Sequence, residues 1–137
     1  MTLAIDASAL VKRYVREPGR ELVLETMAAD PQWCASALAR TEALMALHQV
    51  AVGRRQQTAL WSALRDDWDA FVVVPVDERC LARAVEIGAG FGLRTVDAIH
   101  LAAADRLPRP LKYLTFERQQ IPAAAALGLE VVSPVDL

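Results

Sequence analysis

The chain has 137 residues, of which 54% are hydrophobic, and a formal net charge of −2. This length fits one domain covering residues 1–137, and the composition is that of a globular chain rather than a disordered one. No apolar run approaches the ~18 residues that a membrane helix needs. The start at Met1-Thr2-Leu3 has no basic and apolar leader, so we expect a cytoplasmic protein that does not enter a membrane. The net charge neither indicates nor excludes a nucleic-acid ligand.

Short apolar or β-branched runs alternate with segments of helical periodicity along the chain. The predicted strands cover residues 2–6, 32–35, 71–74, 111–115 and 129–132. The predicted helices cover residues 8–15, 19–28, 37–52, 54–68, 78–89 and 96–107, with a short last helix that ends near residue 127. This alternation predicts an α/β fold with a central, mainly parallel sheet covered by helices on both faces.

Cap and breaker residues set several of these boundaries. Ser36, Asp77 and Thr95 are each predicted to cap the helix that follows. Gly53 is predicted to end one helix, and Gly88 to lie at the end of another. The two cysteines are far apart in sequence, so we expect two buried thiols rather than a disulfide or a zinc site.

Four acidic residues occupy comparable places on this map. Asp6 closes the first strand, Asp97 follows the Thr95 cap, and Glu117 comes two residues after the fourth strand. Strand ends and the starts of the following helices share one edge of a parallel sheet, which is where ligands bind in such folds. Glu42 lies in the first half of its helix and reaches the same edge if that helix leans over it.

The four acids together predict a divalent-metal site. Mg²⁺ prefers oxygen ligands and uses only a few carboxylates, and such an ion activates water and stabilises charge on a phosphate. Without a cation the carboxylates would repel one another and raise their own pKa values. Singly, three of them have a simpler explanation: Asp97 and Glu117 can interact with helix dipoles, and Asp6 can cap a helix. Glu42 is harder to explain in this way because its helical neighbours are mostly apolar.

Four segments resemble the PIN-domain family, and specifically VapC-type toxin ribonucleases. They are Ile5-Asp6-Ala7-Ser8-Ala9-Leu10-Val11-Lys12, residues 36–42, Leu93-Arg94-Thr95-Val96-Asp97-Ala98-Ile99-His100-Leu101-Ala102, and Leu114-Thr115-Phe116-Glu117. The resemblance spans essentially the whole chain. It implies a three-layer α/β/α sandwich and an endoribonuclease that depends on Mg²⁺ or Mn²⁺. It also implies a homodimer and an antitoxin partner that contacts the acidic groove.

The resemblance assigns roles to the acids. Asp6, Glu42 and Asp97 fall on the family's three main acids, so they are the predicted metal ligands and catalytic residues. Glu117 stands where the family usually has Asp; it is included in the same set, although its longer side chain departs from the pattern.

Other polar residues have two possible roles each. Ser8 could contact the metal shell or a phosphate, or only cap a helix. Lys12 and Arg16 are four residues apart; they could follow the phosphates of bound RNA or form a solvated surface. His100 is expected to be a hydrogen-bonded structural histidine.

Two other functions stay open at this point. The chain could be a catalytically inactive PIN-like binding or regulatory module. It could also be a receiver-like phosphoacceptor domain, although such sites place paired acids after the first strand, whereas Asp6 is followed by Ala7.

Overall fold

A computed structural model of the chain describes residues 1–134. Five parallel strands form one sheet in the order β3-β2-β1-β4-β5. Their bounds are β1 Thr2–Ile5, β2 Gln32–Ser36, β3 Phe71–Val74, β4 Leu111–Leu114 and β5 Glu130–Val132. The predicted parallel sheet is therefore confirmed, with every strand at its expected place in the sequence.

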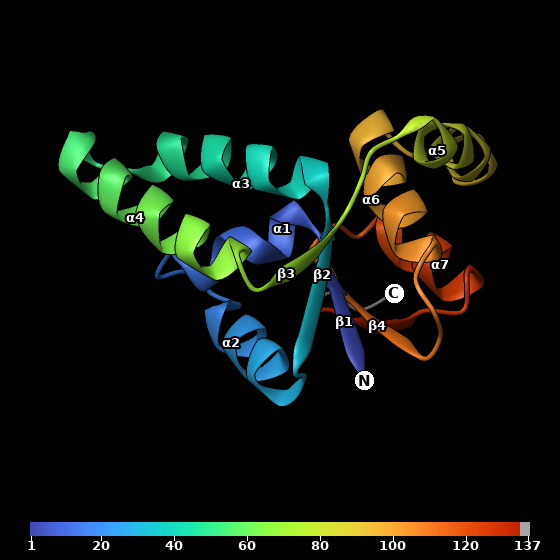
Figure 1. Cartoon of the computed structure of the whole chain (residues 1–137), viewed down its shortest axis with the longest axis horizontal. Helices are drawn as coiled ribbons and strands as arrows, with labels where there is room; N and C mark the ends of the chain where they lie inside the picture. The colour runs from blue at the N-terminus through green and yellow to red at the C-terminus, as the bar shows by residue number, and fades with distance from the viewer. Residues whose placement is uncertain (135–137) are drawn as a thin grey trace.

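Helices connect the strands and cover both faces of the sheet (Figure 1). They are α1 Ala7–Leu10, continued by the 3₁₀ turn η1 Val11–Arg13, then α2 Arg20–Ala29, α3 Ala37–Val50, α4 Gly53–Trp68, α5 Glu78–Phe91, α6 Thr95–Asp105 and α7 Gln120–Ala126. The first four helices lie on one side of the sheet and the last three on the other. This arrangement is the expected three-layer α/β/α sandwich.

Alternation along the strands divides the core in two. In β1, Leu3 and Ile5 pack with α1 to α4, whereas Ala4 packs with α5, α6 and α7. In β4, Leu111 and Tyr113 face the second group of helices and Leu114 faces the first. Successive side chains of a strand point to opposite faces, so a sheet covered on both sides needs the nearly continuous apolar strands seen here.

The strand order places a ligand site between β1 and β4. The chain moves from β1 outward through β2 to β3, and then crosses to β4 on the other side of β1. Ligands of open α/β sheets bind at such a reversal, outside the carboxyl ends of the strands. Asp6 follows β1 directly, and Thr115 follows β4, so both lie at this point.

Several predicted helix boundaries need correction. Gly53 does not end α3; it is the first residue of α4, after a short extended link, and adopts a positive φ of 83°. Gly88 lies inside α5, which continues to Phe91. Arg94, not Thr95, occupies the cap position of α6. Ser36 occupies the cap position of α3 but its side chain makes no capping bond. Asp77 caps α5 as predicted, by accepting a hydrogen bond from Cys80 N–H.

Two further expectations concern thiols and membranes. Cys34 and Cys80 are both buried and free, as predicted. Within residues 1–134, no helix is both long enough and apolar enough to cross a membrane.

Candidate active site

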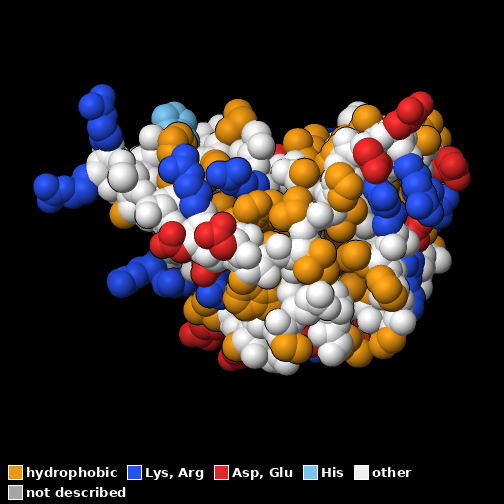
Figure 2. Space-filling view, in the orientation of Figure 1, with side chains coloured by type: hydrophobic (Ala, Val, Ile, Leu, Met, Phe, Trp, Pro, Cys, Tyr) orange, Lys and Arg blue, Asp and Glu red, His pale blue; other side chains and the backbone are white. Residues whose placement is uncertain are grey.

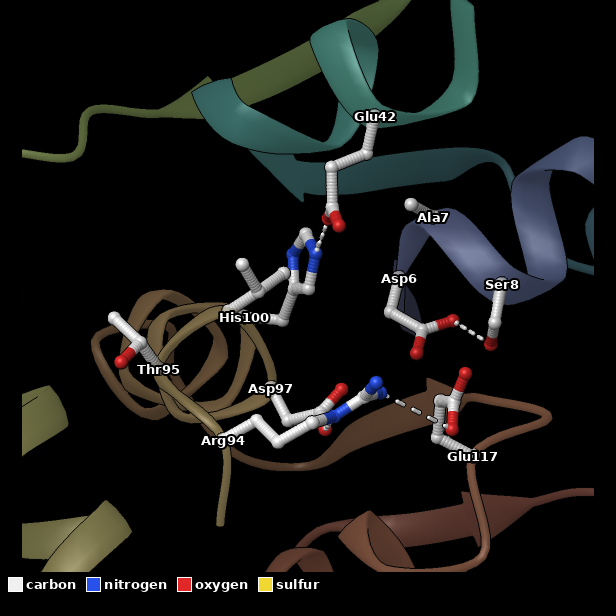
Figure 3. Close-up of a pocket in the computed structure, with 10 residues that line it drawn as sticks. Asp6, Ala7, Ser8, Glu42, Arg94, Thr95, Asp97, His100 and Glu117 are labelled. Atoms are coloured by element: carbon white, nitrogen blue, oxygen red, sulfur yellow. Dashed lines mark hydrogen bonds and ion pairs between the residues drawn. The ribbon is translucent and has the colours of Figure 1, made fainter. Parts of the chain in front are cut away.

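A pocket of about 230 Å³ opens at the reversal between β1 and β4. All four predicted acids line it, although they come from four separate segments of the chain. Figure 3 shows their carboxylates turned toward a common space, with Arg94 and His100 among them. The other lining residues are Ala7, Ser8, Thr95 and Val96. The geometry therefore gathers Asp6, Glu42, Asp97 and Glu117 as the sequence predicted.

Asp6 is the most buried of these acids, with 1% of its surface exposed. Its Oδ1 accepts hydrogen bonds from Ser8 Oγ at 2.7 Å and from Ala9 N–H at 3.0 Å, and the second bond caps α1. Its Oδ2 accepts from Thr115 Oγ1 at 2.7 Å and from Gln120 Nε2 at 3.1 Å. A carboxylate has about four acceptor positions, so a cation would contact Asp6 through a water molecule or by replacing one of these donors.

The pKa of Asp6 reflects its burial. Removal from water disfavours the charged carboxylate and raises this pKa above its ordinary value, while His100 and the hydrogen-bond donors act in the opposite direction. A cation in the pocket would also favour the charged form. The site therefore has unfavourable negative charge that a bound cation would offset.

Asp97 is the second buried acid of the site. It lies in the first turn of α6 and is 4% exposed. Its Oδ1 accepts a hydrogen bond from Gln120 Nε2 at 2.8 Å. Because the same nitrogen atom donates to Asp6, the two carboxylates are close neighbours, as a shared cation requires.

Arg94 contacts both Asp97 and Glu117. Its Nε donates to Asp97 Oδ2 at 3.0 Å, and its Nη2 lies 3.6 Å from Glu117 Oε2 (Figure 3). The guanidinium side chain is 74% exposed, so this contact is screened by solvent. Burial and the neighbouring Asp97 carboxylate raise the pKa of Glu117, and Arg94 opposes that shift.

Glu42 interacts with His100. Its carboxylate contacts His100 Nε2, while His100 Nδ1 bonds Ser36 Oγ at 3.0 Å. The prediction that His100 is hydrogen-bonded holds, and the same ring also lines the acidic pocket. Its bond to Ser36 explains why that hydroxyl does not cap α3.

The donor set of the pocket fits a hard divalent cation. Four carboxylate side chains and no thiol are among its lining residues, and such ligands suit Mg²⁺ and Mn²⁺. Across residues 1–134, however, no three His, Cys, Asp or Glu side chains are arranged around one point as ligands. Glu42 turns to His100, and Gln120 and Arg94 take up oxygens of Asp97. Mg²⁺ needs only one or two protein carboxylates beside its waters, so the arrangement fits a largely hydrated ion.

The three residues predicted to contact RNA are placed differently from one another. Ser8 lines the pocket, and its hydroxyl also accepts a hydrogen bond from Phe116 N–H at 3.0 Å. Lys12 is outside the pocket lining and forms an ion pair with Glu17 at 2.6 Å. Arg16 is exposed and also lies outside that lining.

Two polar residues of the site were missed by sequence reasoning. Arg94 stands three residues before Asp97, a spacing that brings side chains together at a helix start. Gln120 lies on the same face of α7 as the buried residues Ala123 and Ala124. A polar residue on the apolar face of a short helix was the available signal, because such a side chain must find partners.

Residues 3–126 match the family model of the PIN domain. The chain belongs to the PIN-domain family. This confirms the resemblance that the four sequence segments indicated, and it gives the acidic pocket a family context.

Two relatives of this PIN domain are named as ribonucleases. It is 36% identical to Ribonuclease VapC46 of Mycobacterium tuberculosis over 131 residues, which cover 95% of each chain. It is 29% identical to Ribonuclease VapC47 of the same species, again over 95% of each.

Solved structures support the fold. The crystal structure of FitAcB from Neisseria gonorrhoeae matches with a TM-score of 0.74 at 17% identity, covering 98% of this chain and 99% of the other. A toxin-antitoxin complex from Klebsiella pneumoniae matches with a TM-score of 0.71 at 19% identity, covering 98% and 99%. At these identities the likeness concerns the fold alone.

Proposed function

We propose that this PIN domain is a divalent-metal-dependent endoribonuclease that acts as the toxin of a toxin–antitoxin pair. One observation carries the proposal: four carboxylates from separate segments line one pocket at the reversal point of the sheet. The similarity to two proteins named as VapC ribonucleases supports RNA as the substrate of that pocket. An inactive PIN-like binding module would not need to keep all four acids in one pocket.

Asp6, Glu42, Asp97 and Glu117 would together hold the ion, Mg²⁺ or Mn²⁺, one or two of them directly and the others through its bound waters. Bound there, it would make a water molecule more nucleophilic and stabilise the charge that develops on the phosphate. The acids provide the negative field that attracts the ion, and the buried pair Asp6 and Asp97 is held in place by Gln120.

Basic groups at the rim would bring RNA to this acidic centre. The exposed guanidinium of Arg94 can form paired hydrogen bonds with a phosphate. Ser8 lies in the pocket, and Lys12 and Arg16 follow it along the chain. Figure 2 shows further basic side chains at the far end of the α3–α4 hairpin, where Arg54 and Arg55 are exposed. Such groups bind phosphates without reading sequence.

We propose that an antitoxin inhibits the enzyme by inserting a basic side chain among the carboxylates. Arg94 already contacts Asp97 and Glu117, so these acids can pair with a guanidinium. We also expect a homodimer, for which Leu81 and Val85 on α5 offer exposed apolar surface. Light scattering tests the oligomeric state.

As an enzyme acting on cellular RNA, the protein would work in the cytoplasm.

An RNA-cleavage assay with purified protein tests the function. Wild type is incubated with an RNA pool in Mg²⁺, in Mn²⁺ and in excess chelator, beside Asp97→Asn and the control Asp66→Asn. Asp66 is an exposed acid on α4, outside the pocket. We expect internal cleavage by wild type and by the control only with metal, and none by Asp97→Asn. RNA binding without cleavage under all conditions would instead favour the inactive module.

A further inference from the structure

Gln120 is a buried amide with no exposed surface, at the first position of α7. It stands three residues after Glu117 but does not line the pocket; it lies beneath the carboxylates instead. A buried amide is stable only when its donors and acceptor have partners, and here each has one.

The two hydrogens of the amide nitrogen match the two buried acids. Nε2 lies 3.1 Å from Asp6 Oδ2 and 2.8 Å from Asp97 Oδ1. Ionised carboxylates can only accept hydrogen bonds, and two of them side by side repel. An amide supplies one donor to each without adding charge. A lysine here would neutralise the site, a glutamate would add to the repulsion, and a serine has one donor for two acceptors.

Tyr113 sets the orientation of this amide. Its hydroxyl donates to Gln120 Oε1, and the ring is buried in the core with 1% exposure. The reversed amide would place its oxygen against two carboxylates and its nitrogen against the hydroxyl. The two carboxylates therefore exclude the reversed amide, and the hydroxyl of Tyr113 holds the remaining orientation by donating to the amide oxygen.

We propose that Gln120, oriented by Tyr113, is a positioning residue for the divalent cation. The inference rests on the proposed metal-dependent function. Gln120 Nε2 bonds both carboxyl groups and so keeps them together before a cation binds. It acts through Asp6 and Asp97 and does not itself touch the ion or the RNA. Groups that orient metal ligands from behind typically change metal affinity 10–100-fold when they are mutated.

Mn²⁺ titration calorimetry on the purified protein tests this directly. Gln120→Met keeps an unbranched side chain of similar length and removes both donors. We expect it to weaken Mn²⁺ binding by about 10-fold or more. The matched control is Gln119→Met, at the neighbouring exposed position, which should bind as wild type. Urea denaturation of the metal-free proteins measures the structural effect separately.

A purely structural role gives a different result. Gln120→Met would then unfold at lower urea, yet the folded protein would bind Mn²⁺ as tightly as wild type, and this outcome overturns the proposal. If Gln120→Met does not fold, Tyr113→Phe carries the test, because it removes one hydroxyl and keeps the ring. We expect a smaller loss of Mn²⁺ affinity in the same direction, and unchanged affinity overturns the proposal.

The same titrations separate this inference from the proposed function. Wild type that binds Mn²⁺ but leaves RNA intact would contradict the ribonuclease, while a weakened Gln120→Met would still support positioning. Wild type that cleaves RNA while Gln120→Met binds Mn²⁺ normally would contradict positioning alone. A wild-type protein without measurable Mn²⁺ binding would overturn both.

Discussion

Substituting Asp6 by asparagine removes a charge while keeping a helix cap. Asparagine caps a helix about as well as aspartate, so its oxygen can keep the bond from Ala9 N–H. The new amide nitrogen then faces two donors, Thr115 Oγ1 and Gln120 Nε2. The threonine hydroxyl can rotate to accept, whereas the Gln120 nitrogen cannot. One mismatched buried donor costs about 1–3 kcal/mol, and removing an unfavourable buried charge offsets it. Metal-free Asp6→Asn should therefore be within about 2 kcal/mol of wild type.

Metal should distinguish the two proteins clearly. At a free Mn²⁺ concentration of 100 times Kd, binding to the folded state stabilises wild type by about 2.7 kcal/mol. For a chain of this size that gain corresponds to a rise in Tm of roughly 8–11 °C. Asp6→Asn should gain much less and should not cleave RNA. Scanning calorimetry with increasing Mn²⁺ measures the rise, with Asp66→Asn as the control that behaves as wild type. Equal gains in wild type and Asp6→Asn would refute the assignment of Asp6 to the site.

Three further predictions concern charge in the pocket and on the surface near it. Glu117→Gln should reduce RNA cleavage less than Asp6→Asn does, and Glu117→Asp should retain most activity; equal loss at saturating metal would make Glu117 an indispensable ligand. Lys12→Ala combined with Arg16→Ala should flatten the salt dependence of RNA affinity with metal affinity unchanged, and identical slopes would return both to a surface role. Burial raises the pKa of Asp6 in the folded state, so stability is fully present below the ordinary carboxyl pKa and is lost as pH rises through the raised one. In chelator, wild type should therefore lose stability relative to Asp6→Asn across that window, by up to about 1.4 kcal/mol per pH unit, as urea denaturation at each pH measures.

The fold could be predicted because its signals are local. The strands are short segments rich in apolar or β-branched residues, and alternation with helices leaves few arrangements open. Helix boundaries were harder to predict where the same type of residue can stand at more than one position of a helix end. Gly53 at a positive φ begins a helix here instead of ending one, and Thr95 is the first residue of α6 instead of its cap. The choice in each case depends on the path of the connecting chain.

The acidic residues of the site could be predicted from the sequence, whereas the polar residues that hold them in place could not. Asp6, Asp97 and Glu117 follow strand ends or begin helices, and parallel topology brings such positions to one edge. The bonds from Gln120 join residues 6, 97 and 120, and nothing local in the sequence specifies that meeting. Arg94 likewise acquires its contact with Glu117 only when α6 and the end of β4 come together.

Asp6 both caps α1 and lines the acidic pocket, so its structural and its functional explanation are compatible. Its Oδ1 caps α1 and bonds Ser8, whereas its Oδ2 bonds Thr115 and Gln120 beneath the pocket. The first oxygen joins the end of β1 to its own helix, and the second joins it to the segment after β4. Stability and site geometry therefore depend on different atoms of one carboxylate. Asparagine, which can preserve the first set of bonds and disturb the second, is for that reason a sharper probe of the site than alanine, which removes both.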